Sequence, residues 1–161
     1  MSATDSLRTS ASGAELFERG CRLLEEGNPE EALGCLEEAH RRHPENARMR
    51  SHYGLCLGMV EHRFEKAVEL CRSAVKQEFF NPDLYLNLAR VHLNFGFKSE
   101  AIRYLRRGQM IDPANQRIAE LLHQLGERRS QVLGFLPRHH PLNRLLGRAR
   151  WRIGRVRSVA A

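Results

Sequence analysis

The chain has 161 residues, of which 42% are hydrophobic and 28% charged, and its formal net charge is +7. This length allows one domain with short tails, and the apolar fraction is sufficient for a hydrophobic core. No apolar run approaches the roughly 18 residues that a membrane-spanning helix requires. Length and composition therefore argue against a large multidomain enzyme, a membrane channel and a disulfide scaffold.

The N-terminal residues 1–12 are polar, and we expect them to be disordered and not to act as a secretory signal, because they lack an apolar segment. The four cysteines, Cys21, Cys35, Cys56 and Cys71, form no C-x-x-C pair and fall in apolar-periodic segments. We expect buried free thiols in a reducing compartment, and hence a cytoplasmic location. No Cys/His set has the spacing of a zinc site, so neither a metal nor a cofactor is expected.

Three successive segments of 34, 35 and 34 residues, namely 13–46, 47–81 and 82–115, can be aligned with one another. Small residues recur at three matched points in these segments: Gly20, Gly54 and Ala89; Ala32, Ala67 and Ala101; Ala39, Ala74 and Gly108. Small side chains let two antiparallel helices approach closely, and each pair then buries its apolar stripe on the next pair. The sequence therefore predicts stacked helix pairs.

The turns inside the segments also follow a pattern. Gly27 can end one helix in the left-handed conformation and Asn28 can cap the next, while Gly96 ends the corresponding helix of the third segment. The second segment has His62 and Arg63 at this place, so we expect an altered turn there.

Residues 116–127 predict one further helix, whose apolar side would cover the end of the array. The small residues, with Pro44 and Pro113 closing the first and third segments, resemble the tetratricopeptide repeat pattern of 34 residues. The resemblance covers about two-thirds of the chain. It implies an all-α, right-handed solenoid of three helix-turn-helix units, 13–46, 47–81 and 82–115, with the cap 116–127 and a basic C-terminal helix. It also implies a non-catalytic scaffold or adaptor that binds a peptide or helix of a partner protein in a concave groove.

The first helix of each pair would line this groove. Helical spacing points to the following side chains: Phe17, Cys21 and Leu24 in the first unit; Arg48, His52, Leu55 and Met59 in the second; Leu86, Asn87, Arg90, Leu93 and Asn94 in the third. Each apolar member could equally belong to the core. Some relatives hold chaperone tails with a carboxylate clamp, but here only Asn87 and Arg90 suit one. We therefore expect an amphipathic ligand segment with a few acidic residues.

Residues 128–161 hold nine arginines and no acid, whereas residues 1–127 hold 17 basic and 19 acidic residues, a net charge of −2. Within this tail, residues 142–157 predict an amphipathic helix whose arginines occupy the flanks and the side opposite the apolar stripe, with Trp151 among them. These arginines are Arg144, Arg148, Arg150, Arg152, Arg155 and Arg157. Three roles remain open for the tail: docking on the repeats, binding an anionic membrane, or binding nucleic acid. The alternative function is accordingly a recruitment factor that the tail anchors to nucleic acid or to an anionic membrane.

No catalytic signature is present, since the chain has no G-x-S-x-G, P-loop, H-E-x-x-H or dinucleotide fingerprint. We therefore expect a protein that is not an enzyme. The 23 arginines against three lysines hint at a bacterial source with a genome rich in G and C.

Overall fold

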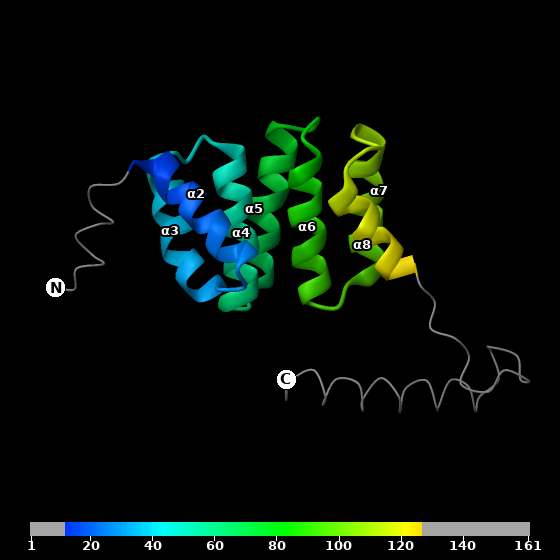
Figure 1. The fold of residues 1–161 in the computed structure, drawn as a ribbon, viewed down its shortest axis with the longest axis horizontal. Helices are drawn as coiled ribbons and strands as arrows, with labels where there is room; N and C mark the ends of the chain where they lie inside the picture. Colours follow the sequence, from blue (N-terminus) through cyan, green and yellow to red (C-terminus); the bar gives the residue numbers. More distant parts are fainter. Residues whose placement is uncertain (1–11, 127–161) are drawn as a thin grey trace, which may run out of the picture. The chain divides into compact units, whose positions relative to one another are not determined.

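A computed structural model describes residues 12–126, which fold into seven α-helices without a strand (Figure 1). The helices are α2 (Gly13–Glu25), α3 (Pro29–Arg42), α4 (Ala47–Val60), α5 (Phe64–Gln77), α6 (Pro82–Asn94), α7 (Lys98–Ile111) and α8 (Gln116–Gly126). The tail 128–161, with its expected helix 142–157 and its arginines, lies outside the described residues, as do residues 1–11.

The helices form three consecutive pairs, α2 with α3, α4 with α5 and α6 with α7, and three residues connect the two helices of each pair. Each pair also packs on the next through α3 on α4 and through α4 and α5 on α6. Figure 1 shows these helices side by side, from α2 at one end of the repeat array to α8 at the other. The all-α class expected from the sequence is confirmed. None of the described helices is both long and apolar enough to cross a lipid bilayer.

Small residues lie where the two helices of a pair touch. A Cβ atom on Gly20 would lie 2.6 Å from Leu36 Cγ, and one on Gly54 would lie 2.9 Å from Leu70 Cβ. Both distances are shorter than side-chain carbons tolerate. The recurrence of small residues in the sequence thus marks the contact points between the paired helices.

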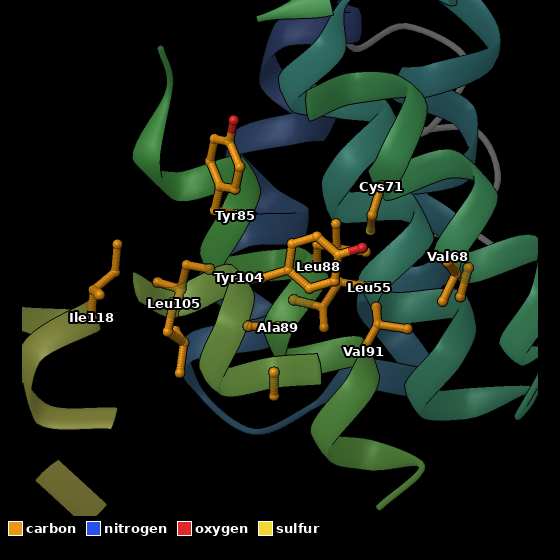
Figure 2. Packing of buried hydrophobic residues seen from close by; sticks show 13 residues of the cluster. Leu55, Val68, Cys71, Tyr85, Leu88, Ala89, Val91, Tyr104, Leu105 and Ile118 are labelled. Carbon is orange, nitrogen blue, oxygen red and sulfur yellow. The ribbon is translucent and has the colours of Figure 1, made fainter. Parts of the chain in front are cut away.

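The largest buried cluster runs through the second and third pairs and reaches α8. Figure 2 shows Leu88 and Val91 of α6 close to Leu55 of α4 and to the ring of Tyr104 of α7. Ile118, fully buried, brings α8 into the same cluster. The core is therefore continuous across the second and third pairs and the last helix, as expected for a stacked array.

The turns of the first and third pairs match the expectation. Gly27 and Gly96 both adopt a left-handed backbone, with φ of 83° and 82°. Asn28 precedes α3 at the N-cap position, but its side chain makes no capping hydrogen bond, so this detail of the expectation was wrong. Its backbone N–H instead donates to Leu23 O at 2.8 Å, which closes the end of α2.

The middle turn keeps the same length but differs in chemistry. His62 takes the left-handed conformation with a φ of 54°, the only non-glycine residue to do so between residues 12 and 126. The carbonyl of Gly58, near the end of α4, accepts a hydrogen bond from the side chain of Asn94 at 2.8 Å. The middle turn therefore keeps its length and its left-handed residue. It differs from the other two in residue type and in the hydrogen bond that a neighbouring unit donates to the end of α4.

Candidate functional site

A concave cavity of about 980 Å³ lies along α2, α4, α6 and α8. Every side chain that helical spacing assigned to the groove lines this cavity: Phe17, Cys21, Leu24, Arg48, His52, Leu55, Met59, Leu86, Asn87, Arg90, Leu93 and Asn94. The lining contains no residue of α3, α5 or α7. The first helices of the pairs and the last helix thus form one concave surface, which we call the groove.

The apolar side chains of the groove differ in how much surface they offer. Leu86, Leu55 and Phe17 are 1%, 4% and 6% exposed, so they belong mainly to the core. Met59 is 38% exposed and presents its side chain to the groove. From the sequence, each of these residues could belong to the core or to the groove. Their exposed fractions assign Leu86, Leu55 and Phe17 mainly to the core and Met59 to the groove surface.

At the α4 side of the groove, Arg48 lies over the ring of Phe17, with its guanidinium carbon 5.8 Å from the ring centroid. The imidazole of His52 meets the same ring edge-on at 5.1 Å and its Nδ1 lies 2.9 Å from Arg48 O. Burial lowers the pKa of His52, so the imidazole is neutral near pH 7. The positive charge at this point of the groove is therefore that of Arg48.

Two asparagines of α6 tie the groove surface to α4. The buried Asn87 donates from its side-chain amide to Ser51 Oγ at 3.2 Å, and Asn94 donates to Gly58 O. In both cases the amide nitrogen donates to α4 and is not directed into the groove. These bonds hold α4 and α6 in register along the groove.

Arg90 is the second exposed cation of the groove. Partial loss of hydration and the nearby charge of Arg117 lower the pKa of Arg90, although the group remains charged at neutral pH. Arg117 itself pairs with Asp83 at 3.2 Å, joining α8 to α6. Within residues 12–126, neither Arg48 nor Arg90 has an ion-pair partner, so both guanidinium groups are available to a ligand.

The sequence interpretation missed part of the lining. It described the groove as aliphatic and cationic, but the carboxylates of Glu18, Glu25, Asp83 and Glu120 also line it. It treated the last helix as a cap, yet α8 contributes to the groove with Arg117, Glu120, Leu121 and Gln124. These four positions have the spacing i, i+3, i+4 and i+7, so the same helical rule applied to α8 would have found them.

The thiols of this region are chemically quiet. Burial is the main reason that the pKa of Cys71 rises to about 12 and that of Cys21, in the groove, to about 11. Within residues 12–126, no three His, Cys, Asp or Glu side chains are grouped closely enough to hold a metal ion. What the groove offers is surface, hydrogen-bonding groups and charge.

Stacked helix pairs with a continuous concave surface define an α-helical repeat protein. Two family models, each described as tetratricopeptide repeat, match residues 17–79 and 60–125. Together they span residues 17–125, and the chain belongs to the tetratricopeptide repeat family. No curated protein matches the chain.

Solved structures of repeat proteins share the fold. The first TPR of Spaghetti (RPAP3), bound to the HSP90 peptide SRMEEVD, is 18% identical with a TM-score of 0.57, covering 71% of this chain and 90% of that one. The second TPR domain of human RPAP3, in complex with the HSP70 peptide SGPTIEEVD, is 16% identical with a TM-score of 0.56, covering 72% and 96%. YrrB, a TPR protein with an unusual peptide-binding site, is 20% identical with a TM-score of 0.58, covering 71% and 59%. At these identities the likeness establishes the fold.

Proposed function

We propose that this protein is a non-catalytic interaction scaffold whose groove binds a peptide or helical segment of a partner protein. The observation that carries the proposal is the pair of exposed, unpaired guanidinium groups of Arg48 and Arg90 in one continuous groove. Unpaired cations beside partly apolar surface suit an amphipathic segment, which would bury its apolar side and pair its carboxylates.

The similar structures support this mode of binding. Two of them hold peptides of chaperones that end in EEVD. In this chain Phe17 and Cys21 stand where a clamp for a terminal carboxylate would require a cation and an amide. We therefore propose a ligand whose acidic residues lie within the segment, opposite Arg48 and Arg90.

The acidic residues of the groove refine the ligand further. Glu18 and Glu25 lie on α2 and Glu120 lies on α8, so carboxylates flank the central arginines. A ligand with its acids in the middle and basic or neutral residues toward its ends would match this distribution, because like charges in contact oppose binding.

The test uses the full chain and peptides selected from a displayed random library. The double variant Arg48→Glu/Arg90→Glu reverses the two free charges at exposed positions and should abolish binding of the selected peptides, measured by calorimetry. Leu55 is unsuitable for such a change because at 4% exposure a charge there would destabilise the core.

The matched control is Arg19→Glu/Arg22→Glu, which changes the charge equally on exposed residues of α2 outside the groove lining. It should leave peptide affinity unchanged. The proposal would be contradicted if both double variants lost peptide affinity equally, or if neither of them lost it.

The alternative function, a recruitment factor held by the tail on nucleic acid or an anionic membrane, stays a prediction, because Arg144, Trp151 and the other tail residues lie outside the described residues. A cytoplasmic location and a bacterial source also remain predictions. Comparison of residues 1–161 with 1–127 tests the tail: a protein partner bound in the groove should be retained by both chains.

A further inference from the structure

The outer layer of the array carries a second charged surface, independent of the proposed groove. Helix α7 exposes Arg103, Arg106, Arg107 and, 83% exposed, Met110. At 100° per residue these four positions lie within an arc of about 100°. We call the three arginines the α7 arginine face.

The opposite side of α7 is committed to the core. Tyr104 and Leu105 belong to the main buried cluster, and Gly108 is buried where α7 meets Ile118. The α7 arginine face therefore points away from the core, and it contributes nothing to the groove lining. A partner can reach it whether or not the groove is occupied.

None of the three cations forms an ion pair within residues 12–126, although Glu100, one turn before Arg103, lies close enough for the charge of Arg103 to help lower its pKa. The guanidinium carbon of Arg103 lies 5.5 Å from the centroid of the Tyr104 ring. The outer helix of the first pair differs, because Glu38 there binds Arg41 at 2.7 Å and Arg42 at 2.6 Å. Among the outer helices α3, α5 and α7, only α7 exposes three arginines without an ion pair in residues 12–126.

The net charge at aligned positions of the three outer helices, α3, α5 and α7, rises along the chain. The residues that correspond to Arg103, Arg106, Arg107 and Met110 are Glu69, Arg72, Ser73 and Lys76 in α5, and Gly34, Glu37, Glu38 and Arg41 in α3. The net charge at these positions is therefore −1 in α3, +1 in α5 and +3 in α7. Positive charge accumulates toward the end of the array that continues into residues 128–161, with their nine arginines.

We propose that the α7 arginine face binds the phosphate backbone of a nucleic acid. Guanidinium groups pair with phosphate in a planar, bidentate manner, and such contacts require charge but no pocket and no apolar anchor. Binding to an anionic membrane would need an apolar face to enter the lipid, whereas this surface exposes only Met110. A stable protein interface would need buried aromatic or aliphatic anchors, which the arginines do not provide.

The test measures binding of the full chain to a short fluorescent DNA duplex by anisotropy over a series of salt concentrations. Each phosphate contact contributes about 0.9 to the slope of log affinity against log salt concentration. The variant Arg103→Ala/Arg106→Ala should therefore make the slope shallower by about 2 and weaken binding to every duplex sequence alike. The tail contributes equally to both proteins, so the difference reports the α7 arginine face.

The control is Arg19→Ala/Arg22→Ala, because these residues have the same i, i+3 spacing on an exposed helix and carry the same charge. It should leave the slope unchanged. A slope unaffected by Arg103→Ala/Arg106→Ala, or lowered equally by both double variants, would overturn the proposal. The proposal would also be overturned if Arg103→Ala/Arg106→Ala kept its duplex binding but lost binding to vesicles containing phosphatidylserine. That result would assign the face to a membrane. Circular dichroism establishes that both variants keep the helical content.

Discussion

The side-chain amide of Asn94 donates a hydrogen bond to the backbone carbonyl of Gly58 over 2.8 Å, from the end of α6 to the last turn of α4. Carbonyls in the last turn of a helix lack an intrahelical partner, so this bond satisfies a group that the helix leaves open. One repeat unit thus completes the end of its neighbour's helix.

Replacing Asn94 by Ala should lower the free energy of unfolding by about 1 kcal/mol, because the Gly58 carbonyl loses its donor. Urea denaturation measures the change. Gln124→Ala, at another exposed groove position, should change stability by less than about 0.5 kcal/mol. Equal effects of the two substitutions would show that the bond contributes nothing specific.

Gly54→Ala tests the close approach of α4 and α5. A Cβ atom there would lie 2.9 Å from Leu70 Cβ and 3.1 Å from the backbone oxygen of Ala67. Because backbone atoms give way with difficulty, we expect a loss of about 1–2 kcal/mol, despite the better helix propensity of Ala. Thermal unfolding should show no such loss for Gly126→Ala, where nothing lies within 4 Å of the new atom.

The left-handed residues of the first two turns predict opposite effects. His62→Gly should stabilise the protein by about 0.5–1 kcal/mol, because its φ of 54° costs a residue with a side chain but not a glycine. Gly27→Ala, at a φ of 83°, should destabilise it by about 1 kcal/mol. Chemical denaturation of both variants tests the pair, and a destabilised His62→Gly would mean that the contact between His62 and Phe95 outweighs the backbone strain.

Lowering the pH should decrease the stability of the protein because of His92. This side chain is 5% exposed, neither ring nitrogen has a hydrogen-bond partner in residues 12–126, and its ring stacks on Tyr104 at 5.2 Å. Burial is the main reason that the pKa of His92 is lowered, with Arg72 and Arg103 acting in the same direction and Glu100 opposing them.

The unfolded chain therefore takes up a proton at His92 below about pH 6.5 while the folded chain does not, so stability decreases as the pH falls through that range. At most this contributes a slope of about 1.4 kcal/mol per pH unit. His92→Phe, which keeps an aromatic ring against Tyr104, should have a shallower dependence in unfolding experiments from pH 7 to pH 5. An unchanged slope would assign the effect to other histidines with lowered pKa, namely His40 and His52.

The repeat architecture could be predicted from the sequence because it depends on local signals. Gly20 and Gly54 mark the helix contacts, and Gly27 and Gly96 mark the turns, each through a property of the residue itself. Positions on the groove could be predicted for the same reason, since the side of a helix follows from its period.

The burial of a side chain and its hydrogen-bond partners depend on how neighbouring units pack against each other. No local sequence signal contains this information. Leu55 and Met59 occupy one side of α4, yet one is 4% exposed and the other 38%. The bond from Asn94 to Gly58 spans 36 residues of sequence, and a sequence pattern gives no reason to pair them. The middle turn could thus be expected to differ, but not in what way.

The extensive contacts of helices α2 to α7 are with their immediate neighbours or with the helix one place further along the chain. Such an array opens from its ends, so backbone amides of α2 and α8 should exchange with solvent sooner than those of α4 and α6. A segment lying in the groove would contact α2 and α8 at once and tie the two fraying ends together. Occupancy would then be readable as slower exchange in both end helices, and not only in α4 and α6, which carry Arg48 and Arg90.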